Sequence, residues 1–128
     1  VKIREGLAKS SDPEKFKQAI LDLFNELPFE YSLTDKYSLQ EKSYTREELD
    51  ARGLQDEPPQ LRRSIVQVVD MPEVEVFYKK VSQLLNIELE VPVPHTTIFA
   101  WSDYEKKKDR GIGVSSKDDF EAYNKGYL

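Results

Sequence analysis

The stretch from Val91 to Trp101 constrains the fold more than any other part of the chain. It holds the only histidine and the only tryptophan of the 128 residues. Pro92 and Pro94 fix their own φ angles and bias the residue before each toward an extended conformation. The β-branched and aromatic residues that follow predict a strand. Because both faces of this strand are largely apolar beyond Thr97, we expect it to lie in the interior of a sheet.

Alternation along that strand makes a candidate phosphate site. We expect His95, Thr97, Phe99 and Trp101 to share one face. An imidazole exchanges a proton near neutral pH, and a threonine hydroxyl can donate a hydrogen bond to a phosphoryl oxygen. The alternative is that His95 only caps the end of the strand, which is the commoner role for a histidine in so short a motif.

Two capped amphipathic helices are predicted on either side of the chain's middle. The first begins at Ser11-Asp12-Pro13-Glu14, which combines a capping residue with a proline in the first turn, and it ends at Pro28. The second begins at Asp70, as its cap, and ends at Asn86. Apolar residues recur at helical spacing along both, so each predicts one buried stripe.

The order of the predicted elements indicates an α+β fold, with a sheet on which the two main helices pack. Strands are predicted at residues 29–33, 65–69 and 95–101, and a short one at 111–114. Each main helix is followed by a strand, so the chain is interpreted as two pseudo-repeated α–β lobes. We expect a single domain over residues 1–128, in which 1–60 form a partial or degenerate first lobe and 61–128 form the second lobe.

Composition excludes several classes of function. The net charge of −5 is unsuited to non-specific DNA binding. Without cysteine there is no disulfide or thiolate chemistry, and no metal site or other cofactor is predicted. No G-x-S-x-G elbow of a serine hydrolase occurs. With no membrane-spanning run and no signal peptide visible in the sequence, we expect a cytoplasmic protein that does not bind membranes.

A basic segment follows the His95 strand. Lys107, Lys108 and Arg110 lie in the polar stretch after Trp101. We predict that these cations and the Trp101 ring help to bind a substrate phosphate close to His95. The alternative is a solvated loop without function.

The second half of the chain resembles the 2H phosphoesterase superfamily, which includes 2′-5′ RNA ligase-like proteins and cyclic phosphodiesterases. The resemblance rests on the strand Ile65–Val69, the helix Pro72–Leu85, the motif Pro94–Phe99 and the segment Gly111–Val114, and it covers residues 63 to about 123. It implies a hydrolase with two pseudo-symmetric lobes, each of which contributes one His-x-Ser/Thr motif to a shared cleft.

The resemblance implies roles for two residues of this chain. His95 would be a general acid or base on a nucleotide or RNA end that carries a 2′,3′-cyclic phosphate or a 2′-5′ linkage. Thr97 would hold a phosphate oxygen. One positioned acid–base group contributes about two to four orders of magnitude in rate, so we expect ligand binding before efficient turnover.

The chain departs from the family pattern because it has no second histidine. The repeat places Tyr31-Ser32-Leu33-Thr34 where the first motif would lie. Three explanations are open: the chain is a piece of a longer protein whose first lobe holds the histidine, the first lobe has lost its motif, or the likeness is accidental. The second explanation predicts a non-catalytic module that binds a nucleotide or, through residues 29–44, a protein partner.

Overall fold

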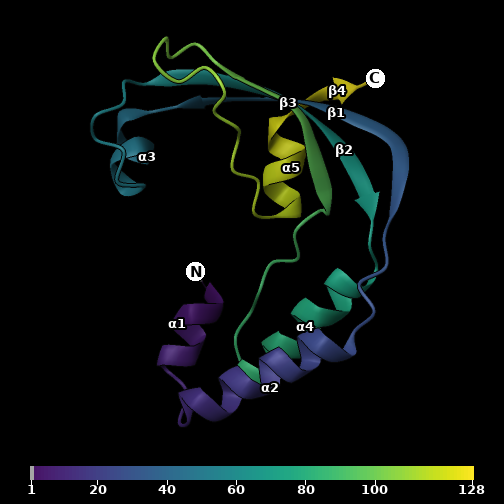
Figure 1. Cartoon of the computed structure of the whole chain (residues 1–128). Coiled ribbons are helices and arrows are strands. Elements are labelled where there is room, and N and C mark those ends of the chain that lie inside the picture. The colour runs from purple at the N-terminus through teal and green to yellow at the C-terminus, as the bar shows by residue number, and fades with distance from the viewer. Residues whose placement is uncertain (1) are drawn as a thin grey trace.

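A computed structural model describes residues 2–128 as a four-stranded antiparallel sheet with helices (Figure 1). The predicted α+β class is confirmed. The elements in chain order are α1 (Lys2–Ala8), α2 (Pro13–Glu26), β1 (Ser32–Tyr44), α3 (Arg46–Ala51), β2 (Gln60–Asp70), α4 (Glu73–Leu85), β3 (His95–Ser102), α5 (Lys117–Tyr123) and β4 (Asn124–Tyr127).

The sheet has the order β3-β2-β1-β4, so its centre is the long antiparallel pair of β1 and β2. Register in this pair runs from Ser32 opposite Asp70 to Tyr44 opposite Gln60. The strand predicted at residues 29–33 is therefore displaced and much too short, because β1 spans 13 residues. Its second half is polar in sequence, and the strand is concealed because two of these polar side chains, Ser38 and Gln40, are buried and form hydrogen bonds.

The position of β3 corrects a second prediction. This strand pairs only with β2 and forms an edge of the sheet, whereas the sequence predicted an interior strand. Ile98 and Phe99 are 56% and 52% exposed. The apolar residues on both faces of the strand predicted that it would be buried, but no segment of residues 2–128 covers Ile98 and Phe99 fully.

The helix boundaries follow the capping residues in one case and not in the other. In α2, the Asp12 side chain accepts a hydrogen bond from the Lys15 amide at 3.2 Å, and Pro13 is the first helical residue. Helix α4 has Pro72 at its cap position with no side-chain cap bond, so the predicted role of Asp70 is wrong. Asn86 closes α4 in the left-handed conformation, with φ of 52°.

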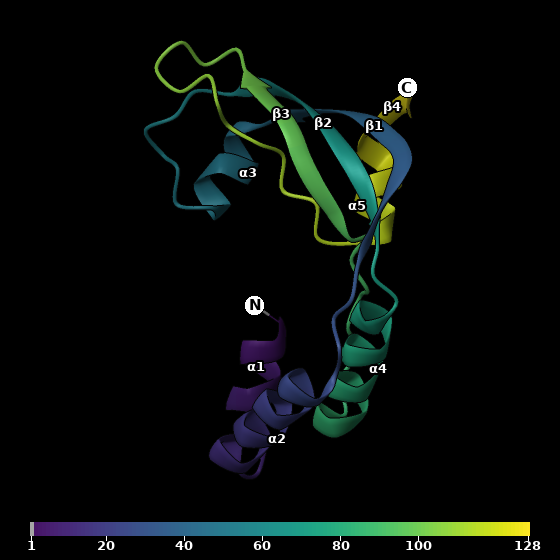
Figure 2. The same cartoon turned by 45° about the vertical axis from the view of Figure 1, so that its right-hand side comes forward.

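Helices α1, α2 and α4 form a separate group, here called the helical end, beyond one end of the sheet (Figures 1 and 2). The main helices were predicted to pack on the sheet, but α2 packs against α4 and α1 instead. The rings of Phe24, Phe29 and Phe77 meet there, with centroids 5.1–6.1 Å apart. No residue of α2 is buried, so its predicted apolar stripe is only half covered.

The sheet, α3 and α5 form the other part, here called the sheet body. Helix α5 covers one face of the sheet (Figures 1 and 2) and buries Phe120, which is 3% exposed. Much of the buried strand surface there is polar and internally bonded: Gln40 donates to the Phe120 carbonyl at 3.3 Å, and Ser38 donates to Asn124 at 2.7 Å. Residues 111–114, predicted as a strand, are irregular.

Candidate functional site

His95 is held at the start of β3 by its backbone surroundings. Its Nδ1 lies 2.7 Å from the carbonyl oxygen of Val93. Because a carbonyl only accepts, Nδ1 carries the proton of the neutral ring, and Nε2 is left as the acceptor. The half-buried ring lies 6.2 Å from the ring of Phe120, between centroids. The strand thus presents an oriented imidazole whose second nitrogen has no hydrogen-bond partner within residues 2–128.

Thr97 lies on the same face of the sheet as His95. In the ladder, His95 pairs with Val68 and Thr97 pairs with Val66. Val66 and Val68 are two residues apart on one strand, so their partners share a face. Thr97 is exposed, and its hydroxyl makes no hydrogen bond to another described residue. The pair predicted from the sequence is therefore brought together.

A bulge separates Trp101 from this pair. Phe99 is opposite Ile65, so the register shifts and Ile98 is an extra residue on β3. A shift of one residue moves every later side chain to the other face. Phe99 and Trp101 therefore lie on the face opposite His95, and the prediction that all four side chains share a face is wrong.

The basic segment begins at the far end of β3. Ser102 is opposite Arg62, six residues along β2 from the partner of His95. At about 3.3 Å per residue, this spacing is about 20 Å. Lys107 and Lys108 are exposed, and Lys108 pairs with Glu105 at 3.1 Å. The lysines predicted to bind phosphate therefore follow the end of β3 that is remote from His95.

Arg110 belongs to a buried ionic cluster. Its Nη2 donates to Glu57 at 2.6 Å, and the Glu57 side chain is only 5% exposed. Arg62 lies 3.8 Å from the same carboxylate and stacks over the Tyr44 ring at 4.2 Å. Burial lowers the pKa of Arg62 from its ordinary value. We interpret this arrangement as a structural network, because the buried Glu57 carboxylate pairs with both arginines and offsets part of their charge.

Lys42 and Glu48 extend this network toward α5. Their charged groups are 2.8 Å apart, and Lys42 also donates to the Tyr123 hydroxyl at 2.8 Å. Burial by itself lowers the pKa of Lys42, but the hydrogen bonds to Glu48 and Tyr123 outweigh it and raise the pKa. The hydrogen bond from Lys42 lowers the pKa of Glu48.

A groove of about 710 Å³ adjoins His95, where the sheet meets α4. It is lined by Tyr31, Leu33, Gln67, Val69, Met71, Val74, Tyr78, Pro92, Pro94, His95 and Thr96. None of these residues is Lys, Arg, Asp or Glu. The Tyr31 side chain is 67% exposed. No sequence signal pointed to Tyr78 or Gln67 as ligand-binding residues, because Tyr78 lies within the second predicted amphipathic helix and Gln67 within a predicted strand.

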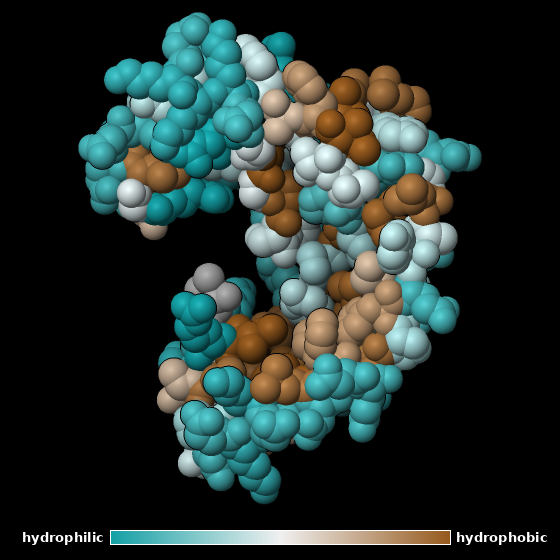
Figure 3. Space-filling view, in the orientation of Figure 1, coloured by the Kyte–Doolittle hydropathy of each residue, from teal (hydrophilic) through white to brown (hydrophobic). Residues whose placement is uncertain are grey.

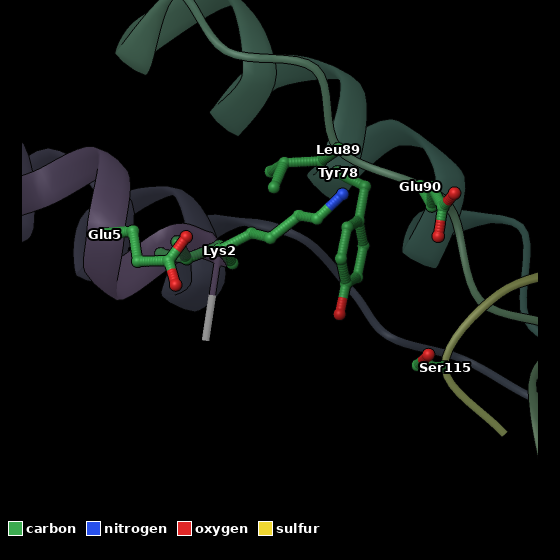
Figure 4. Close-up of a pocket in the computed structure, with 7 residues that line it drawn as sticks. Lys2, Glu5, Tyr78, Leu89, Glu90 and Ser115 are labelled. Carbon is green, nitrogen blue, oxygen red and sulfur yellow. The ribbon is translucent and has the colours of Figure 1, made fainter. Parts of the chain in front are cut away.

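A second hollow of about 450 Å³ separates the helical end from the sheet body (Figure 3). Figure 4 shows the Lys2 ammonium group directed toward Tyr78, with Ser115 on the other side of the hollow. Ile3, Glu5, Leu89 and Glu90 complete its lining, and Tyr78 lines both this hollow and the groove. It contains neither His95 nor Thr97.

Within residues 2–128, no group of three or more His, Asp or Glu side chains is arranged to hold a metal ion. None of the described helices is both long and apolar enough to cross a membrane.

No family model, curated protein or solved structure matches this chain. The function is therefore inferred from the oriented imidazole, the hydroxyl beside it and the groove.

Proposed function

We propose that the chain binds the phosphate of a nucleotide or RNA end through His95 and Thr97. The ligand class is the one that the 2H resemblance implies, a 2′,3′-cyclic phosphate or a 2′-5′ linkage. The observation that carries the proposal is that Nδ1 of His95 is fixed by the Val93 carbonyl while Nε2 and the Thr97 hydroxyl lack partners on one face. These two groups supply one proton-exchanging nitrogen and one hydrogen-bond donor, as a phosphoryl group requires.

The chemistry available to this pair is half of a phosphoester reaction. A neutral His95 accepts the proton of an attacking hydroxyl or water, and a protonated one gives a proton to the leaving oxygen. Both steps are needed in a full displacement, and the sequence has one histidine. The second candidate function, nucleotide binding without turnover, is favoured by that single histidine.

The test compares two substitutions at Thr97 in binding to 2′,3′-cyclic AMP, measured by calorimetry. Thr97→Val removes the hydroxyl and is expected to weaken binding about ten- to a hundredfold, since a hydrogen bond to a charged group contributes about 1.5–3 kcal/mol. Thr97→Ser keeps the hydroxyl and should bind as the parent does. Equal affinity of all three proteins, or no binding at all, contradicts the proposal.

A hydrolysis assay separates the two candidate functions. If the parent protein opens the cyclic phosphate, His95→Gln is expected to lower the rate by about two to four orders of magnitude. Hydrolysis that His95→Gln leaves unchanged contradicts catalysis by this residue. Binding without measurable hydrolysis supports the non-catalytic module.

A further inference from the structure

We infer that the groove beside His95 receives the nucleobase of the bound nucleotide, and that it favours a base with an exocyclic amino group. This inference deepens the proposed function and rests on it only for the placement of the phosphate.

The walls of the groove suit a flat, uncharged ring. Tyr31 and Tyr78 contribute aromatic side chains, and Pro92 and Pro94 contribute apolar surface. The volume of about 710 Å³ lies within the range of about 300–1,000 Å³ typical of small-molecule sites. Since no charged residue lines the groove, a phosphate gains nothing there, whereas a base gains stacking and apolar contact.

Tyr31 gives the strongest indication that the groove binds a ligand. Its side chain is 67% exposed although it stands beside an apolar groove, and no hydrogen bond to another described residue holds it. Leu33, two residues later, is 59% exposed on the same lining. Neighbouring exposed apolar side chains at a concave surface indicate a binding site more than a packing role.

Gln67 supplies the polar selectivity. This residue is buried, and its amide nitrogen donates to the carbonyl oxygen of Thr34 at 3.0 Å. Because that carbonyl only accepts, the orientation of the amide is settled, and its oxygen is the end left to accept. An acceptor fits the amino group of adenine, cytosine or guanine. Uracil has no exocyclic amino group.

His95 connects the groove to the phosphate pair. It lines the groove, and it also shares a sheet face with Thr97. Thr96, the next residue, lines the groove and pairs with Gln67. Thr96 and Gln67 lie on the sheet face opposite Thr97. His95, which borders the groove and also neighbours Thr97, is therefore where the sugar and phosphate of a bound nucleotide would pass around the edge strand β3.

The first experiment measures adenosine binding to the parent chain and to three variants by calorimetry. Tyr31→Ala is expected to weaken binding about ten- to a hundredfold, because one base–aromatic stack contributes that much. Tyr31→Phe keeps the ring and should stay within about twofold. Tyr127→Ala is the matched control, since Tyr127 is 50% exposed on β4 and does not line the groove. No adenosine binding, or an unaltered affinity in Tyr31→Ala, overturns the inference.

The second experiment compares adenosine with purine riboside, which lacks only the amino group. We expect purine riboside to bind about five- to tenfold more weakly, as the loss of one hydrogen bond to the Gln67 oxygen implies. Equal affinities overturn the preference assigned to Gln67.

The nucleoside results are independent of the phosphate site. If adenosine binds as predicted but 2′,3′-cyclic AMP binds no more tightly and ignores Thr97→Val, the groove inference stands and the proposed function falls. If inorganic phosphate responds to Thr97→Val while no nucleoside binds, the groove inference falls and the phosphate site stands.

Discussion

The two ends of β3 differ in what their polar groups do. At the Ser102 end, the Ser102 hydroxyl donates to Gln60 at 3.0 Å, and Glu57 neutralises Arg110 within a buried cluster. At the His95 end, the imidazole has one hydrogen-bond contact, to the Val93 carbonyl. The Thr97 hydroxyl has no hydrogen-bond partner within residues 2–128, and the groove beside His95 is lined without Lys, Arg, Asp or Glu. The buried charged groups at the Ser102 end are paired with an opposite charge, whereas Nε2 of His95 and the Thr97 hydroxyl have no partner in the described part of the chain.

This contrast separates stability from function. Buried charges at the Ser102 end are stable only because each has an opposite charge or a hydrogen bond, so they are committed to holding the fold. The free imidazole nitrogen and exposed Tyr31 at the His95 end contribute little to folding and are available to a ligand. Substitutions should therefore lower stability at one end and ligand affinity at the other.

The largest effect is expected from Glu57→Ala at the Ser102 end. This change leaves Arg62 buried, and Arg110 in part, without their carboxylate, and should lower the free energy of unfolding by about 3 kcal/mol. Urea denaturation measures it, with the exposed Glu121→Ala as the control, expected within about 0.5 kcal/mol. Similar midpoints for the two variants would show that the cluster does not stabilise the fold.

A smaller loss is expected from Tyr44→Phe. The buried Tyr44 hydroxyl accepts a hydrogen bond from the Gly113 amide at 3.1 Å, and the ring carries the Arg62 stack, which phenylalanine keeps. The free energy of unfolding should fall by about 1 kcal/mol. A loss as large as that of Glu57→Ala in the same urea experiment would contradict the assignment of most of the stability to the ion pairs.

At the other end, His95→Gln should change stability by less than about 1 kcal/mol, because only one backbone contact of a half-buried ring is altered. The same variant should lose binding of 2′,3′-cyclic AMP, measured by calorimetry on the folded protein. As a control, His95→Gln should unfold cooperatively in urea with a midpoint close to that of the parent, which shows that the variant is folded. A stability loss comparable to that of Glu57→Ala would give His95 a structural role and remove the contrast.

The smallest effect concerns pH. The pKa of Glu48 is lowered in the fold, so its contribution is present above the ordinary carboxyl pKa of about 4.3 and is lost as pH falls below that value. The pKa of Lys42 is raised, so its contribution is present below about 10.4 and is lost as pH rises through the raised value. Because the Lys42–Glu48 pair is partly solvated, we expect it to contribute a few tenths of a kcal/mol to the free energy of unfolding.

The pH effect is measured by urea denaturation across pH on the parent and on Lys42→Met. The difference between the two profiles should be largest between those limits and shrink outside them. A difference that stays constant with pH would mean that the ion pair contributes nothing.

Local sequence signals predicted the elements well where a cap or a proline fixes them. Asp12 and Pro13 give the start of α2, and the proline at position 94 gives the start of β3 at His95. The placement of His95 and Thr97 on one face followed from the alternation of side chains along the strand. The two residues are so close in sequence that no bulge lies between them.

The remaining features depend on contacts between distant segments. The bulge at Ile98 moves Trp101 to the other face, and it exists only in the pairing with β2. The length of β1 was concealed because the buried Ser38 hydroxyl and Gln40 amide nitrogen donate hydrogen bonds to Asn124 and Phe120, 80 or more residues away. The separation of Arg110 from His95 likewise follows from the length of β3, which extends to Ser102. The motif Pro94–Phe99 does not show where that strand ends.

The most direct test of the account is an NMR titration of the His95 ring, which is the only imidazole in the chain. We expect 2′,3′-cyclic AMP to shift the ring signals saturably, Thr97→Val to weaken this response and Thr97→Ser to preserve it. Ring signals that stay unchanged on addition of 2′,3′-cyclic AMP, adenosine or inorganic phosphate would contradict the account and leave His95 as a residue that only orders the start of β3.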